Sequence, residues 1–168
     1  MNEISLHIKN FLQIQNECVN KIQENTHEID EIIKMIISAR KNKKTIFTMG
    51  NGGSGSTASH FVSDLQKTVI VKNENRIKAI SLVDNIPVIL AWSNDVSFDK
   101  IFEEQLKNQV EKNDIVIAFS GSGKSKNIIN ALKIAKKMGA KCIGFTGKTG
   151  GSFNAICDIT FKVPSNDM

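Results

Sequence analysis

From residue 43 onward, short apolar runs alternate with segments of helical spacing, and this alternation limits the possible folds more than any other feature. Such a chain forms a parallel sheet, because each helix crosses over the sheet and covers one of its faces. Helices are expected near residues 57–67, 99–111 and 125–138. The expected strands are Thr45–Met49, Ile77–Val83, Ile115–Phe119, Cys142–Phe145 and Ile159–Val163. The sequence therefore predicts a three-layer α/β/α domain with a five-stranded parallel sheet over residues 43–168.

The first 42 residues have a different pattern, in which apolar side chains recur at helical spacing without strand-like runs between them. The clearest group consists of Ile29, Ile32, Ile33, Ile36 and Ile37. Two helices with such broad apolar stripes need a covering surface, and both the chain's own domain and another subunit would serve. Our working hypothesis is that residues 1–42 form a helical extension used for oligomerisation.

Composition and charge argue against several classes of function. The net charge is +5, but the lysines are spread out, tyrosine is absent, and no segment interleaves basic and aromatic residues as nucleic-acid platforms do. No apolar run approaches the roughly 18 residues of a membrane span, and the N-terminal segment does not resemble a signal peptide. Cys18, Cys142 and Cys157 lack metal-binding spacing. We therefore expect free thiols in a cytoplasmic protein without nucleic-acid or membrane partners.

The first expected strand runs into a turn rich in glycine and serine, which contains Gly50, Gly52, Gly53 and Gly55. Its letters match the GxGxxG fingerprint of dinucleotide-binding proteins. That fingerprint needs an acidic residue about 20 positions further on to hold a ribose hydroxyl, whereas Asp84 lies more than 30 positions beyond Gly50. A nicotinamide or flavin cofactor therefore explains this turn poorly.

The third expected strand ends in a second turn of similar composition, SGSGKS. A P-loop would need glycine in place of Ala118 and an aspartate after the next strand, so nucleotide hydrolysis is disfavoured. Both turns nevertheless follow a strand and open a helix, where backbone N–H groups and serine hydroxyls bind phosphate. Ligands bind at this carboxyl end of the strands in open α/β sheets. We therefore predict a phosphate site that includes Ser120, Ser122 and Ser125.

Several motifs, in the same order along the chain, resemble one known family. GNGGSGSTASHF is similar to the GNGGSAxDAQHF signature of the phosphoheptose isomerases, members of the sugar isomerase (SIS) family of phosphosugar-binding domains. AFSGSGKSKNI resembles that family's ISTSGNSxNV turn, WSNDVSF its GNDYGF motif, and GFTGKTGG its LTGxxGG motif. KVPSND resembles the exit from the last strand into a helix. The resemblance runs from about residue 45 to the last residue and implies the SIS form of the flavodoxin-like fold.

The resemblance implies a sugar-phosphate site that is built from both turns and from the WSNDVSF motif. The serine turn would hold the phosphate, and the Asn-Asp pair would hold sugar hydroxyls. The implied contacts are Asn51, Gly52, Gly53, Ser54, Asn94, Asp95, Ser120, Gly121, Ser122 and Ser125.

The resemblance also implies a zinc ligand at His60, and at Asp64 a residue that is both zinc ligand and catalytic acid/base. Their i, i+4 spacing places both side chains on one face of a helix. The family has glutamate at this second position, and the shorter Asp64 draws the carboxylate back by roughly 1 Å, which can cost about 100-fold in rate. Thr57 and Ser59 replace the family's aspartate and glutamine.

The resemblance implies interconversion of sedoheptulose 7-phosphate and D-glycero-D-manno-heptose 7-phosphate through an enediol(ate), for heptose and surface polysaccharide biosynthesis, by a homotetramer. In the family a further helix supplies a Gln and a His that complete the metal site, whereas this sequence stops at Met168. We therefore expect weak zinc binding and negligible turnover from residues 1–168. The alternative is a non-catalytic sugar-phosphate-binding or partner-regulating protein. Isomerases of hexulose or arabinose phosphates stay open as well.

Overall fold

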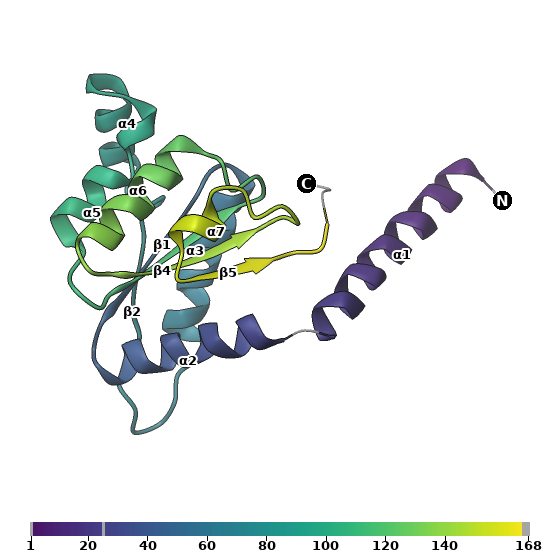
Figure 1. Cartoon of the computed structure of the whole chain (residues 1–168), viewed down its shortest axis with the longest axis horizontal. Helices are drawn as coiled ribbons and strands as arrows, with labels where there is room; N and C mark the ends of the chain where they lie inside the picture. The colour runs from purple at the N-terminus through teal and green to yellow at the C-terminus, as the bar shows by residue number, and fades with distance from the viewer. Residues whose placement is uncertain (1, 25, 166–168) are drawn as a thin grey trace.

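The computed structural model describes residues 2–24 and 26–165, and Figure 1 shows the course of the chain. Within these residues, five parallel strands form one sheet in the order β2-β1-β3-β4-β5. Their bounds are β1 Thr45–Gly50, β2 Lys78–Ser81, β3 Ile115–Ser120, β4 Lys141–Thr146 and β5 Ile159–Lys162. The predicted parallel sheet is confirmed. The last three residues of the sequence, which end the KVPSND exit, lie outside the described residues.

Helices cover both faces of this sheet. These covering helices are α2 His27–Lys41, α3 Gly53–Lys67, α5 Glu103–Gln109, α6 Lys126–Lys137 and α7 Phe153–Ile156. Helix α4, Ile86–Asp95, has no buried residue and lies against the 3-10 helix η1, Phe98–Lys100. Buried residues of β3 alternate between two core clusters. Val116 and Ala118 pack with α5, α6 and α7, whereas Ile115 and Ile117 pack with α2 and α3. The three-layer α/β/α architecture is thus confirmed.

Three local predictions differ from the structure. Helix α3 begins at Gly53, inside the glycine turn, rather than near residue 57. The segment 99–111 is divided between η1 and α5. Helix α4 is not predicted by the spacing, although Asn85 caps its first turn and Pro87 lies in that turn. Proline is favourable there, because the first N–H groups of a helix need no partner within the helix.

The two N-terminal helices differ in how they are packed. Helix α2 buries Ile32 and Ala39 in the core beside the sheet. Helix α1, Glu3–Gln23, has no buried residue and extends away from the sheet (Figure 1). Its apolar side chains are exposed, among them Ile4 at 67% and Leu12 at 55%. Because an isolated helix is marginal in water, its apolar stripe needs a cover that the described domain does not provide.

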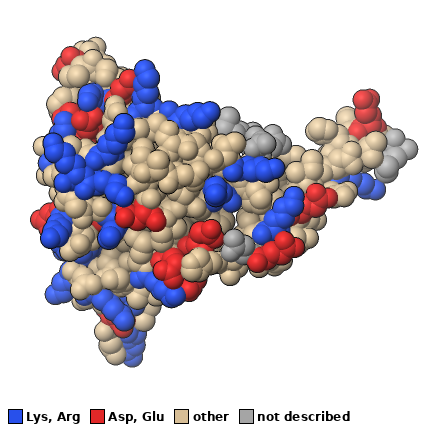
Figure 2. All heavy atoms as spheres, viewed as in Figure 1, with Lys and Arg blue, Asp and Glu red and all other residues tan. Residues whose placement is uncertain are grey.

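Charged side chains of both signs occur on the face of the molecule drawn in Figure 2, including along α1. Several lysines pair with neighbouring acids, as Lys34 does with Asp30 at 2.6 Å and Glu31 at 3.0 Å. Among the described helices, none is long and apolar enough to cross a membrane.

Candidate functional site

The two glycine- and serine-rich turns lie next to each other at the carboxyl ends of β1 and β3. These strands are neighbours at the centre of the sheet. The chain passes from β1 to β2 on one side and returns to β3 on the other, so this is the point where the strand order reverses. Ligands bind at such a switch point in open α/β sheets, outside the carboxyl ends of the strands.

The glycines of the first turn allow the backbone to reverse from strand into helix within a few residues. Gly50 ends β1, and a Cβ on it would lie 2.3 Å from the carbonyl oxygen of Ser54. Gly55 packs back on the same turn, where a Cβ would lie 3.0 Å from the carbonyl oxygen of Gly50. Any side chain at these positions would push α3 away from the strand. The compact turn brings the N-terminus of α3 close to the end of β1.

The second turn holds its serines in a local hydrogen-bond pattern. Ser120 Oγ accepts a hydrogen bond from the N–H of Gly123 at 3.2 Å, and Ser122 Oγ accepts one from the N–H of Lys124 at 3.2 Å. These bonds use the hydroxyl oxygens as acceptors, so each O–H can still donate to a phosphate. Ser125 is the N-cap residue of α6, and its side chain makes no capping hydrogen bond.

A third loop, which follows β4, supports the serine turn through backbone contacts. The N–H of Gly147 donates to the carbonyl oxygen of Gly121 at 2.9 Å, and the N–H of Ser152 donates to that of Gly123 at 2.9 Å. Thr146 Oγ1 lies 3.3 Å from the Gly121 carbonyl oxygen. This loop carries the GFTGKTGG motif, so the motif has a structural role in holding the second turn.

The larger of two cavities at this edge has a volume of about 840 Å³ and lies between the two turns and the third loop. Two aromatic rings, those of Phe119 and Phe145, stack at a centroid distance of 5.1 Å and form part of its wall. Among the described residues that line it there are two lysines and no carboxylate, a combination that favours an anion. The polar lining from the turns and the third loop includes Asn51, Ser54, Ser120, Ser122, Lys124 and Lys148.

The second cavity, of about 680 Å³, lies along the other side of the first turn. Gly52, His60 and Asp84 line it, together with serines of α3. Phe98 and other apolar residues of the η1 region form its far wall. Asn51 borders both cavities. A ligand with a phosphate in one cavity would therefore pass Asn51 to enter the other.

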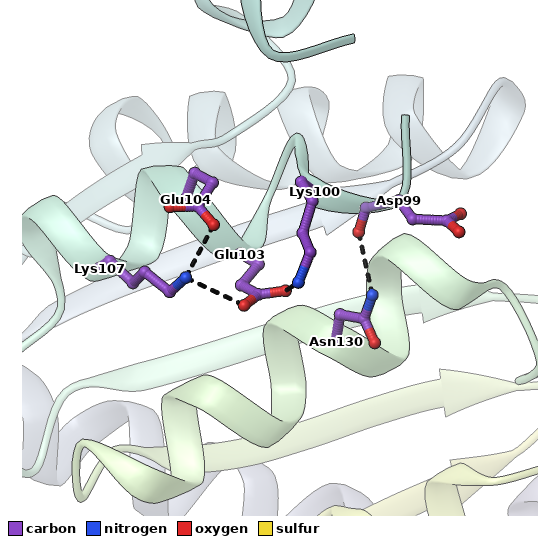
Figure 3. Close-up of polar contacts among 6 residues, drawn as sticks. All are labelled: Asp99, Lys100, Glu103, Glu104, Lys107 and Asn130. Carbon is purple, nitrogen blue, oxygen red and sulfur yellow. Dashed lines mark hydrogen bonds and ion pairs between the residues drawn. The ribbon is translucent and has the colours of Figure 1, made fainter. Parts of the chain in front are cut away.

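A network of ion pairs holds the segment that forms this far wall (Figure 3). Glu103 lies between Lys100 Nζ at 2.7 Å and Lys107 Nζ at 3.1 Å. Asn130 of α6 donates to the backbone oxygen of Asp99 at 3.2 Å. Burial alone would raise the pKa of Glu103, but the hydrogen bonds from the two lysines outweigh it and hold this pKa below its usual range. The carboxylate therefore stays charged and ties η1 to α5.

His60 and Asp64 lie on one face of α3, with His60 Nε2 and Asp64 Oδ2 separated by 3.6 Å. Both side chains are exposed, and only His60 lines a cavity. Two ligands of a tetrahedral zinc ion lie roughly 3.4 Å apart, so this spacing suits two donors to one ion. In the described part of the chain, however, no group of three His, Cys, Asp or Glu could hold a metal. Zinc sites use three or four protein ligands, so these residues do not make up a zinc site.

The structure brings most of the predicted contacts together but leaves some apart. Asn94 and Asp95 lie at the exposed end of α4, where Asn94 Nδ2 donates to Asp95 Oδ1 at 2.8 Å, and neither lines the two cavities. Ser125 also lies outside both linings. Lys124 and Lys148 line the larger cavity but were not among the predicted contacts, although both lie within motifs that resemble those of the family.

Comparisons with known proteins agree with this geometry. The model of the SIS domain family matches residues 10–147. A phosphoheptose isomerase of Aliarcobacter butzleri is 38% identical over 161 residues, which is 95% of this chain and 84% of that protein. One from Campylobacter concisus is 35% identical over 99% of this chain and 83% of its own length.

Solved structures show the same similarity. A phosphoheptose isomerase from Francisella tularensis superposes with a TM-score of 0.92 at 27% identity, covering 100% of this chain and 89% of that one. One from Neisseria gonorrhoeae gives a TM-score of 0.83 at 26% identity, covering 98% and 86%. This chain belongs to the SIS domain family and, within it, to the phosphoheptose isomerases.

Proposed function

We propose that this protein is an aldose–ketose isomerase that interconverts sedoheptulose 7-phosphate and D-glycero-D-manno-heptose 7-phosphate in heptose and surface polysaccharide biosynthesis. One observation supports this most strongly. In a chain of the phosphoheptose isomerase family, two glycine- and serine-rich turns from adjacent strands line one cavity, whose described lining has two lysines and no carboxylate. A phosphate monoester with a polar chain attached suits this cavity and its neighbour.

In this proposal the phosphate occupies the larger cavity. Serine hydroxyls of the second turn and backbone N–H groups at the start of α6 bind it, and Lys124 adds positive charge. The sugar chain extends past Asn51 toward His60 in the smaller cavity. Anchoring the far end of the substrate in this way orients the reacting carbons.

The reaction moves a proton between C1 and C2 through an enediol(ate). A carboxylate takes the proton from the carbon next to the carbonyl, and a second group moves a proton between the two oxygens. We assign the first role to Asp64, one helical turn beyond His60 on α3. His60 and Asp64 supply only two of the three or four protein ligands that a zinc ion needs, so this mechanism routes no step through a metal.

The activity assay follows conversion of sedoheptulose 7-phosphate to the aldose by NMR, in a protein extended by the further helix of the family, because negligible turnover is expected from residues 1–168 alone. We expect turnover to collapse in Asp64→Asn, which keeps the size of the side chain but removes the base, and to be kept or raised in Asp64→Glu. Asp30→Asn, on the exposed surface of α2, is the control and should leave turnover unchanged. Full turnover in Asp64→Asn would remove Asp64 from the mechanism. Tight sugar-phosphate binding without turnover in the wild type would favour the non-catalytic alternative.

We further propose that the protein is a cytoplasmic homotetramer. The free cysteines agree with a reducing compartment, and the uncovered stripe of α1 supplies apolar surface for contact between subunits. Light scattering should show a tetramer for the full chain and a smaller species after deletion of residues 1–24. Because α1 buries no residue in the domain, the truncated protein should still unfold cooperatively, with a circular dichroism signal reduced only by the helix that was removed. A full-length monomer at micromolar concentration would contradict this proposal.

A further inference from the structure

A buried asparagine pair joins the two turns of the site. Asn127, the second residue of α6, is 2% exposed. Its Nδ2 donates to Asn51 Oδ1 at 2.8 Å, and Asn51 Nδ2 donates back to Asn127 Oδ1 at 3.0 Å. The two residues are 76 positions apart in the chain, one in the first turn and the other just after the second.

The pair leaves one hydrogen-bonding group directed at the ligand space. Each amide side chain has one oxygen and two N–H bonds, and the reciprocal pair uses one N–H and the oxygen of each. Asn127 is buried, whereas Asn51 is half-buried and borders both cavities. The second N–H of Asn51 is therefore the one available to a bound molecule. Its direction depends on Asn127, which holds the oxygen and the other N–H of the Asn51 amide.

We propose that Asn127 is a positioning residue that orients Asn51 toward the sugar portion of the substrate and couples the sugar contact to the phosphate turn. This inference rests on the proposed function for the identity of the ligand. Asn127 itself touches no substrate. Without it, Asn51 can rotate freely, and a sugar phosphate loses a preoriented donor while a bare phosphate loses nothing.

The test is a double-mutant cycle with Asn51→Ala, Asn127→Ala and the double variant. Calorimetry measures the affinity for sedoheptulose 7-phosphate and for inorganic phosphate, and kinetics measures kcat and KM. Each single variant should bind the sugar phosphate about 10-fold more weakly, the equivalent of one ordinary hydrogen bond. The double variant should be no weaker than the singles, because all three lack the same arrangement. Affinity for inorganic phosphate should stay within about twofold of the wild type.

Gln66→Ala is the matched control. Gln66 Nε2 donates a hydrogen bond to the backbone oxygen of Ala79 at 2.8 Å. Like the bonds of Asn127, this one is made by a side-chain amide, but Gln66 lines neither cavity. Its loss should lower the melting temperature without changing the affinity for the sugar phosphate. If Asn127 had a merely structural role, Asn127→Ala would lower the melting temperature in the same way. The ratio of the affinity for sedoheptulose 7-phosphate to that for inorganic phosphate would then stay unchanged.

Two outcomes would overturn the inference: unchanged sugar-phosphate affinity in folded Asn127→Ala, or losses that add in the double variant. If the wild-type protein extended by the further helix bound sedoheptulose 7-phosphate without turnover, the isomerase proposal would be refuted, yet the binding cycle would still decide on Asn127. The two proposals can therefore fail separately.

Discussion

Replacement of Gly123 by alanine tests whether the second turn, which follows β3, must keep its shape for folding and for phosphate binding. Gly123 has a φ of +61°, in the region that costs other residues roughly 1–2 kcal/mol. A Cβ there would lie 2.6 Å from the Gly150 carbonyl oxygen and 3.1 Å from Thr146 Oγ1. Because the nearer atom belongs to the backbone, the turn or the loop that supports it has to move, which costs about 1–3 kcal/mol more. The free energy of unfolding should therefore fall by about 2–5 kcal/mol.

Thermal denaturation measures this loss. For a chain of this length, each kcal/mol lowers Tm by roughly 2–4 °C. Calorimetric titration with inorganic phosphate measures the effect on the site, where displaced N–H and O–H donors should lower the affinity at least about 10-fold. Gly53→Ala is the control for Tm, because a Cβ at Gly53 meets no atom within 4 Å and its φ is not positive. Its Tm should stay at the wild-type value.

A Gly123→Ala protein with wild-type Tm and phosphate affinity would refute this reasoning, since it would show that the turn tolerates both the strain and the contact. A lowered Tm with unchanged affinity would contradict the second half of the argument. In that case the shape of the turn would matter for folding but not for binding.

Two further predictions concern charge. Lys124→Gln should weaken phosphate binding about fivefold at low ionic strength and reduce the salt dependence of that binding. Lys112 lines neither cavity, so Lys112→Gln should change neither the affinity nor its salt dependence. Calorimetric titration with phosphate at two salt concentrations measures both quantities. Glu103→Gln tests the network of Figure 3. Because the folded-state pKa of Glu103 lies below the ordinary glutamate value of 4.5, its contribution to stability is present above that pH and is lost as the pH falls through the folded-state pKa. The Tm difference between wild type and Glu103→Gln should be largest above about pH 5 and shrink toward pH 3. A constant difference, or none, would show that the ion pairs do not stabilise the segment.

Local sequence patterns predicted the type and order of the long elements, because burial of a strand or of one helix face imposes its period on neighbouring residues. The glycine turns were equally visible, since a chain that passes from Gly50 into α3 within a few residues leaves no room for a Cβ. The short helices α4 and α7 were missed because ten and four residues are too few to show a helical period.

The sequence by itself determined the fold class and located the two glycine- and serine-rich turns, because both depend on residues close together in the chain. Only the tertiary structure decided which turns meet and what stands between them. The pairing of Asn51 with Asn127 exists because β1 and β3 are neighbours in the sheet. The placement of Asn94 away from both cavities depends on how α4 extends from the sheet. Strand order is set by the sum of many packing contacts across the domain, so no single segment of the sequence contains it.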